Sequence, residues 1–161
     1  MTLYFLLKFA HLIGAAVLLG TGAGIAFFML MAHLTRNAAT IAAVARIVVT
    51  ADFLFTATAV VVQPITGVAL AMVAGYPLSQ AWIVLSIILY IVTGAFWLPV
   101  VWMQMRMRKL AEQAAQTGAP LPDAYHRLFR LWFAFGFPAF AAVLGIVWLM
   151  MTRPVELFGI G

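Results

Sequence analysis

Histidine side chains within an apolar run are the first feature of this sequence that could carry chemistry. His11 lies three positions after Lys8, in a run that is apolar almost throughout from residue 3 to residue 34. An imidazole in hydrocarbon has no water to satisfy it, so an ionisable residue there is a functional candidate by default. Because a neutral imidazole is a ligand for metals and for haem iron, His11 is the leading candidate for a metal or haem ligand. A hydrogen bond that joins two helices is the structural alternative.

Two further histidines point to a separate site. His11 and His33 are 22 positions apart, which is about 33 Å along a helix axis, so they cannot bind one metal ion. His33 and His126 both lie near the ends of apolar runs, in a layer that we expect on the cytoplasmic side. There they could form a bis-histidine haem site, with Arg130 suited to a propionate or another anionic group. A histidine near lipid headgroups is the alternative for His33.

Small residues share a helical stripe with His11. At about 100° per residue, His11, Gly22 and His33 fall close to one line along a helix. Gly20 and Gly24 form a GxxxG pair beside that line. Such spacing lets a neighbouring backbone or a flat ligand approach closely. Helix packing explains the glycines alone, and the alternative is a haem macrocycle over this groove. A sixth iron ligand would then be a methionine such as Met150 or Met151, or would be missing.

Polar residues on the later apolar runs indicate faces that point into a helix bundle. A polar group that faces lipid would cost several kcal/mol. The predicted polar intramembrane positions are Asp52, Gln63, Thr66 and Gln104. Asp52 could either pair with the nearby Arg46 or transfer protons. Gln63 precedes Pro64, which frees a backbone carbonyl and can kink the helix at a place suited to a ligand.

The elements that position these residues follow from composition. Of the 161 residues, 66% are hydrophobic and 8% are charged, whereas soluble domains are about 25% charged. The chain is therefore expected to be a membrane protein with the lipid bilayer as its main partner. The absence of cysteine excludes disulfides and thiolate metal sites. Basic residues flank the apolar runs, which is typical of helix orientation in a bilayer and argues against nucleic-acid binding.

Four apolar runs are long enough to span a membrane. They predict an all-α, polytopic bundle of four transmembrane helices in a single domain, residues 1–161. The predicted helices cover residues 3–34, 48–74, 81–105 with a cytoplasmic extension, and 131–151. The connections 35–47 and 106–130 hold seven basic residues, so the positive-inside rule places both in the cytoplasm and both termini outside. The expected location is the bacterial inner membrane.

Two resemblances rest on these residues. Lys8-Phe9-Ala10-His11-Leu12-Ile13-Gly14, with His33 at the helix end, resembles the first helix of small bacterial haem-biosynthesis membrane proteins that oxidise protoporphyrinogen IX. This resemblance implies a four-helix bundle with a b-type haem on His11 and Lys8 as its neighbour. Three later stretches resemble a bacterial family of predicted integral membrane proteins of unknown function, number 2269. They are Asp52-Phe53, Gln63-Pro64-Ile65-Thr66-Gly67 and Trp97-Leu98-Pro99-Val100-Val101-Trp102-Met103-Gln104.

The function that these features favour is binding of haem b, for electron transfer or for oxidation of a membrane-soluble substrate. Whether the chain is an enzyme stays open. One alternative is a structural or accessory subunit that packs on a membrane protein partner. Another is a small transporter, which would need a homo-oligomer because four helices enclose little room for a solute path. Copper handling through the abundant methionines is the last alternative.

Overall fold

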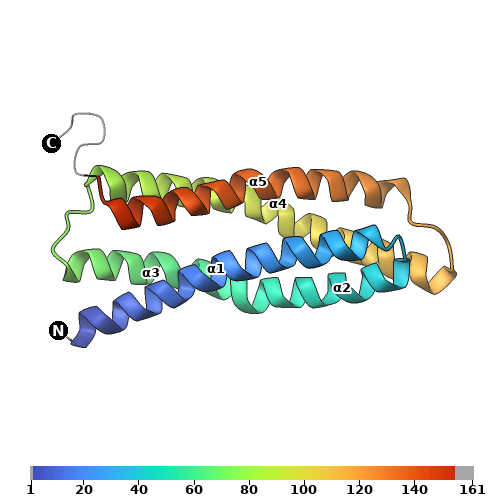
Figure 1. Cartoon of the computed structure of the whole chain (residues 1–161), viewed down its shortest axis with the longest axis horizontal. Helices are drawn as coiled ribbons and strands as arrows, with labels where there is room; N and C mark the ends of the chain where they lie inside the picture. Colours follow the sequence, from blue (N-terminus) through green and yellow to red (C-terminus); the bar gives the residue numbers. More distant parts are fainter. Residues whose placement is uncertain (1, 155–161) are drawn as a thin grey trace.

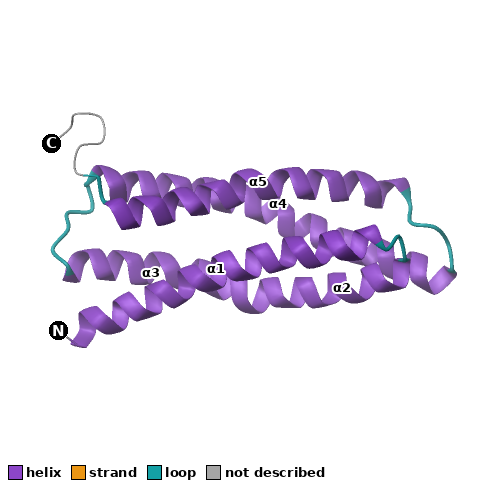
Figure 2. Cartoon of the chain, viewed as in Figure 1, coloured by secondary structure: helices purple, strands orange, loops and turns teal. Residues whose placement is uncertain are grey.

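The chain folds as long helices joined by short connections. The computed structural model describes residues 2–154, and Figures 1 and 2 show the arrangement. The helices in chain order are α1 (Thr2–Leu34), α2 (Ala38–Ala51), the π-helical turn η1 (Asp52–Thr56), α3 (Ala57–Val73), α4 (Ala81–Thr117) and α5 (Asp123–Thr152). Because α2, η1 and α3 run on without a break, four helices are long and apolar enough to cross a membrane. The predicted all-α architecture with four membrane-spanning helices is confirmed.

Two helices begin earlier than the sequence predicts. The second begins at Ala38 instead of residue 48, and the fourth begins at Asp123 instead of residue 131. At Ala38 the cause is local, since the side chain of Asn37 accepts a hydrogen bond from the Thr40 amide at 2.9 Å and caps the helix. Hydropathy marks where a helix enters lipid, and these helices continue beyond that boundary.

One half of the bundle is tightly packed. Its core lies near the connections 35–37 and 118–122, where α2 and α4 pack against α1 and α5. The largest fully buried side chains are all in this packed half: Met29, Ile41, Met107 and Tyr125. In the other half, α1 pairs with α3 while α4 pairs with α5. Figure 1 shows these two pairs as separate layers towards the end that carries residues 74–80.

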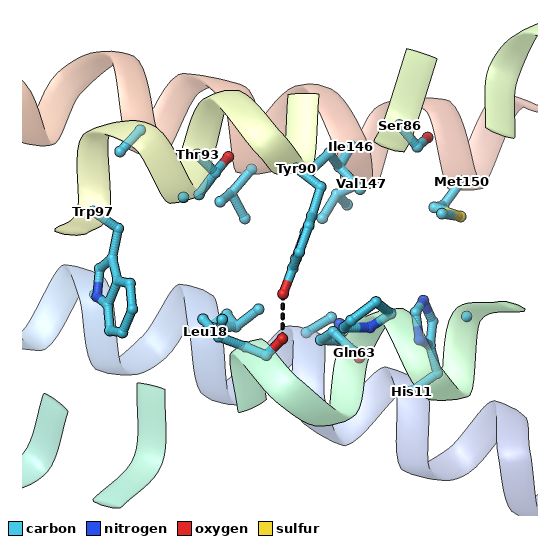
Figure 3. A pocket seen from close by; sticks show the side chains of 18 of the residues that line it. His11, Leu18, Gln63, Ser86, Tyr90, Thr93, Trp97, Ile146, Val147 and Met150 are labelled. Atoms are coloured by element: carbon cyan, nitrogen blue, oxygen red, sulfur yellow. Dashed lines mark hydrogen bonds between the residues drawn. The ribbon is translucent and has the colours of Figure 1, made fainter. Parts of the chain in front are cut away.

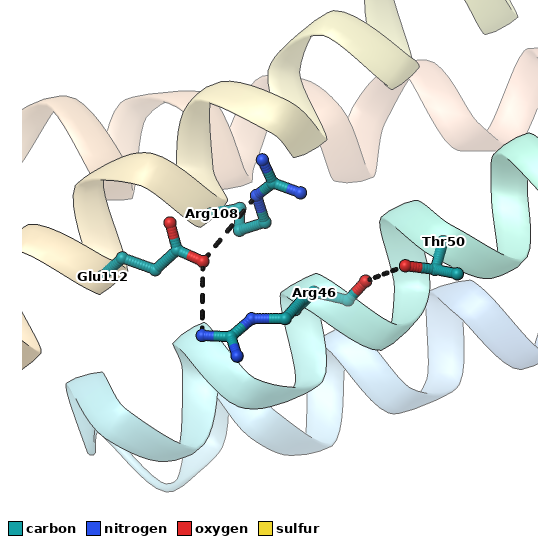
Figure 4. A network of polar contacts seen from close by, with 4 residues as sticks. All are labelled: Arg46, Thr50, Arg108 and Glu112. Carbon is teal, nitrogen blue, oxygen red and sulfur yellow. Dashed lines mark hydrogen bonds and ion pairs between the residues drawn. The ribbon is translucent and has the colours of Figure 1, made fainter.

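An ion pair crosses between α2 and α4 at the polar end of the packed half. Arg46 Nη2 lies 3.5 Å from Glu112 Oε1, and Arg108 Nε lies 3.9 Å from the same oxygen (Figure 4). Thr50 donates to the backbone carbonyl of Arg46 at 2.9 Å. The alternative in which Arg46 pairs with Asp52 is therefore wrong. Spacing along one helix could not show that Glu112 comes from a neighbouring helix.

This ion pair is expected to contribute little to stability. The Arg46 side chain is 66% exposed, and exposed pairs typically contribute about 0.2–1 kcal/mol and are screened by salt. A double-mutant cycle of Arg46→Ala and Glu112→Ala should give a coupling free energy of unfolding below about 1 kcal/mol, decreasing as salt is added. A coupling of several kcal/mol that salt leaves unchanged would contradict this expectation.

Candidate functional site

A cavity of about 720 Å³ lies between the α1–α3 pair and the α4–α5 pair (Figure 3). Its volume falls within the range of about 300–1,000 Å³ that is typical of sites for small molecules and cofactors. Most of its lining side chains are apolar. The sequence singled out four of the polar residues among them, His11, Asp52, Gln63 and Gln104. Four others are on α4: Ser86, Tyr90, Thr93 and Trp97. An apolar cavity with a few convergent polar groups is the usual form of a ligand site.

His11 projects from α1 into this cavity, and residues of α3 contact its ring. Its Nδ1 lies 3.0 Å from Thr66 Oγ1, and the Thr66 hydroxyl donates to the Val62 carbonyl at 2.9 Å. The Thr66 oxygen can therefore accept a hydrogen bond from Nδ1–H, which leaves the lone pair on Nε2. The ring packs on Gly67, where an added Cβ would lie 3.1 Å from His11 Cε1. In Figure 3, Met150 lies on the wall opposite His11.

The side chain of Gln63 locks α3 onto α1 beside this histidine. In the amide orientation that satisfies both of its polar atoms, nitrogen donates to the His11 carbonyl and oxygen accepts from the Ala15 amide, both at 3.0 Å. The close approach requires Gly14, because a Cβ there would lie 2.7 Å from the nearest atom of the Gln63 amide group. The same orientation leaves the amide nitrogen 3.1 Å from His11 Nδ1. If Nδ1 accepts that bond, the proton moves to Nε2, which then presents a donor to the cavity.

Pro64 leaves one backbone carbonyl of α3 without its donor in the helix, and a side chain on the facing wall of the cavity donates to it instead. Proline has no amide proton to donate to the carbonyl four residues earlier, which is that of Val60. The Tyr90 hydroxyl of α4 donates to the Val60 carbonyl across the cavity (Figure 3). A helix within a membrane tolerates proline where a neighbour satisfies the freed group in this way. The proline that the sequence flagged thus gives α3 a hydrogen bond to the facing helix.

At the closed end of the cavity, a buried polar network joins three helices. Asp52 accepts a bond from Trp97 Nε1 at 3.3 Å. With its amide oriented to satisfy both atoms, Gln104 donates to Asp52 Oδ2 at 3.0 Å and accepts from Trp132 Nε1 at 3.1 Å. Asp52 begins the π-helical turn η1, a form that often marks functional sites in helices. Sequence analysis missed Trp132, because nothing in its spacing distinguishes it from the other four tryptophans.

The mouth of the cavity carries two cations. Lys8 on α1 and Arg153 at the end of α5 both line it, and both side chains are exposed. Arg153 Nη1 donates to the Tyr76 hydroxyl at 2.7 Å, while the Lys8 ammonium lies 5.8 Å from the centre of the Tyr4 ring. Two cations from opposite walls are suited to an acidic group on a ligand whose apolar body lies deeper.

The structure brings the second predicted pair of histidines together, in the packed half. The rings of His33 and His126 have centroids 5.9 Å apart, but the His33 ring is stacked on Phe129 with centroids 3.7 Å apart. His33 Nδ1 also lies 3.2 Å from the Tyr125 hydroxyl. His126 and Arg130 are exposed, and neither histidine lines the cavity. The ring of His33 is therefore covered on one face by Phe129 in the packed half, whereas His11 lines the cavity.

The glycines of α1 have different roles from those that the GxxxG pair predicts. Gly22 lines the cavity, and a Cβ there or at Gly20 would have no atom within 4 Å. Gly22 therefore leaves open space on the cavity wall, where a flat ligand could lie. The close helix contact is instead at Gly14, on another part of α1.

Among residues 2–154, no group of three or more histidine, aspartate or glutamate side chains could hold a metal ion. A metal on His11 would therefore need most of its ligands from a non-protein group. A porphyrin supplies four nitrogen atoms and leaves the axial positions to the protein, which matches a site that offers one histidine.

The model of one protein family matches residues 5–154, and its description is Predicted integral membrane protein (DUF2269). The chain belongs to this family. The resemblance to the family numbered 2269 is thus confirmed, and the DUF2269 match includes Lys8, His11, Asp52, Met150 and Arg153. The protein is an integral membrane protein that spans the bilayer four times. No curated protein and no solved structure matches the chain. The resemblance to the protoporphyrinogen-oxidising proteins stays a prediction.

Proposed function

We propose that the cavity binds haem b with His11 as an axial ligand of the iron. The observation that carries this proposal is the position of the imidazole, whose Nδ1 lies 3.0 Å from the Thr66 hydroxyl while the ring faces an apolar cavity. Metal-bound histidines almost always donate their other ring proton to a neighbour in this way. Haem, when bound, would supply one-electron chemistry at a potential set by its protein surroundings.

The chain's own residues have distinct parts in this function. Met150, on the wall opposite His11, is the candidate for the second axial ligand (Figure 3). Lys8 and Arg153 at the mouth suit the propionate groups. The apolar walls keep water from the iron, and open space beside Gly22 leaves room for the macrocycle.

The basic connections support one orientation of this site in the bacterial inner membrane, which we propose as its location. Residues 35–37 and 118–122, together with the adjoining helix ends, carry most of the arginine and lysine residues. The positive-inside rule then places the packed half on the cytoplasmic side, with the mouth of the cavity and both termini outside. Haem in the cavity would thus lie nearer the outer surface.

An optical spectrum tests the proposal. Protein expressed with ample haem and purified should show a Soret band that shifts on reduction with dithionite. The band should be lost in His11→Ala and kept in His126→Ala, a matched control because His126 is exposed and does not line the cavity. A colourless wild type, or a band that survives His11→Ala, would overturn the proposal.

The Thr66 hydroxyl should strengthen haem binding without contacting haem. Loss of such an outer partner typically costs about 10–100-fold in metal affinity. Thr66→Val keeps the shape of the side chain and removes the acceptor for Nδ1, so we expect a loss of haem affinity in this range by titration. Thr58→Val is the control, because Thr58 is exposed and bonds only to the Leu54 carbonyl. Equal affinities in the two variants would contradict this role.

The contact between Gln63 and His11 favours a second candidate function. If Nδ1 accepts from the Gln63 amide, 3.1 Å away, Nε2 carries the proton and donates to a carbonyl oxygen. The cavity would then bind a membrane-soluble carbonyl compound such as a quinone. In that case the purified protein would be colourless, and extraction with organic solvent would release a quinone from the wild type and none from His11→Ala.

A further inference from the structure

The carboxyl group of Asp52 has no part in holding haem, yet it is built into the cavity wall. We propose that Asp52 is a proton-binding site at the closed end of the cavity, protonated in the resting protein and reached by protons from the mouth. This inference goes beyond the proposed function and does not depend on which ligand the cavity takes.

The first support is that the Asp52 carboxyl group is buried and has no salt bridge in the described part of the chain. The Asp52 side chain is only 3% exposed, and both of its oxygens accept bonds from neutral donors, those of Trp97 and Gln104. The salt bridges in residues 2–154 both belong to Glu112. An ionised carboxylate in such a place costs many kcal/mol unless a cation is present, so the group takes up a proton instead.

The other charged and titratable groups that line the cavity come from α1, the connection before α4, α4 and the end of α5, and α3 supplies none. From α1 they are Tyr4, Lys8 and His11; from the connection before α4, Tyr76; from α4, Tyr90; and beyond α5, Arg153. On α2 the nearest cation is Arg46, which is paired with Glu112. The two cations that line the cavity are thus at its mouth. His11 and Trp97, the partner of Asp52, lie at opposite ends of the pocket in Figure 3.

An unsatisfied hydroxyl lies beside the carboxyl group. Thr56 ends the π-helical turn that Asp52 begins, and it is 6% exposed. Its Oγ1 is buried and has no hydrogen-bond partner, which is rare for a polar atom. The hydroxyl can accept a bond from a protonated Asp52 or donate one to the ionised group, so it offers Asp52 a neutral partner in either state.

The second support is the position of Asp52 along the cavity. Beyond Asp52, the packed half closes the bundle with buried side chains such as Val48, Met103 and Trp132. Asp52 and Thr56 line the same cavity as the exposed cations Lys8 and Arg153. We therefore expect a proton to reach Asp52 along this cavity and not through the packed half.

Infrared spectroscopy of the full-length, haem-free protein in lipid nanodiscs tests the proposal separately from haem binding. At neutral pH the wild type should show the carbonyl band of a protonated carboxyl group. This band should be absent from Asp52→Asn and retained in Asp123→Asn, whose carboxyl lies at the exposed start of α5. No such band in the wild type, or a band that persists in Asp52→Asn, would overturn the proposal.

A chemical probe covers the case in which Asp52→Asn fails to fold. Dicyclohexylcarbodiimide enters membranes and adds to protonated carboxyl groups, so mass spectrometry of the wild type should find the adduct on Asp52 at neutral pH. The labelling should fall as pH rises. Labelling of Asp123 with none on Asp52 would overturn the proposal.

Discussion

Replacing Gly67 with valine is expected to weaken haem binding about 10- to 100-fold, although Gly67 bonds to neither haem nor iron. The Cβ alone would lie 3.1 Å from His11 Cε1 and 3.7 Å from Nδ1. Valine adds two methyl groups and must push the imidazole off the Thr66 hydroxyl. Overpacking of this kind costs about 1–3 kcal/mol, and the stated loss of affinity corresponds to roughly 1.4–2.7 kcal/mol, within that range. Haem titration of the purified variant measures the loss.

The control for Gly67→Val is Gly20→Val. Gly20 is exposed on α1, does not line the cavity, and has no atom within 4 Å of an added Cβ. It should bind haem like the wild type. If Gly67→Val also bound haem like the wild type, the ring of His11 would not need its place against α3, and its role as ligand would be in doubt.

Replacing Gly14 with leucine is expected to give the largest loss of stability of any single glycine change in the described chain. A Cβ at Gly14 would lie 2.7 Å from the nearest polar atom of the Gln63 amide group and 3.0 Å from its Cδ. The leucine must push α3 away and break the two bonds that Gln63 makes to α1. Overpacking and the lost hydrogen bonds together amount to about 3–5 kcal/mol. For a chain of this length, the midpoint of thermal unfolding in detergent should fall by roughly 10 °C.

The matched change is Gly20→Leu on the same helix, which should shift the midpoint by no more than a degree or two because it meets open space. Gln63→Ala combined with Gly14→Leu should recover part of the loss, since it removes the clashing group. A Gly14→Leu protein as stable as the wild type would show that α1 and α3 do not meet at this point.

The sequence alone was sufficient for the spans and the family. Runs of apolar residues report the passage through lipid directly, so four spans were predictable and the structure has them. An imidazole inside such a run is rare enough to single out His11. The helix starts at Ala38 and Asp123 were not predictable from hydropathy, because a helix can continue into water when capping and packing support it.

The partners of the polar groups could not be predicted from one sequence. Arg46 is close to Asp52 along the chain, yet it pairs with Glu112 on another helix. The GxxxG pair is a packing signal, yet the close approach is at Gly14, because the helix face that meets α3 is decided by how the helices cross. His33 and His126 do come together, but with Phe129 stacked on His33. The accessory-subunit and transporter functions stay predictions from the sequence.

Titration of haem into haem-free protein is the most direct test of the central claim, that His11 in the cavity holds an iron porphyrin. The wild type should develop a Soret band that saturates at one haem per chain, and His11→Ala should show only the spectrum of free haem. His33→Ala should behave like the wild type, because its ring lies in the packed half, away from the cavity. A wild type that gives no saturable band, or an His11→Ala variant with the same end point, would contradict the claim.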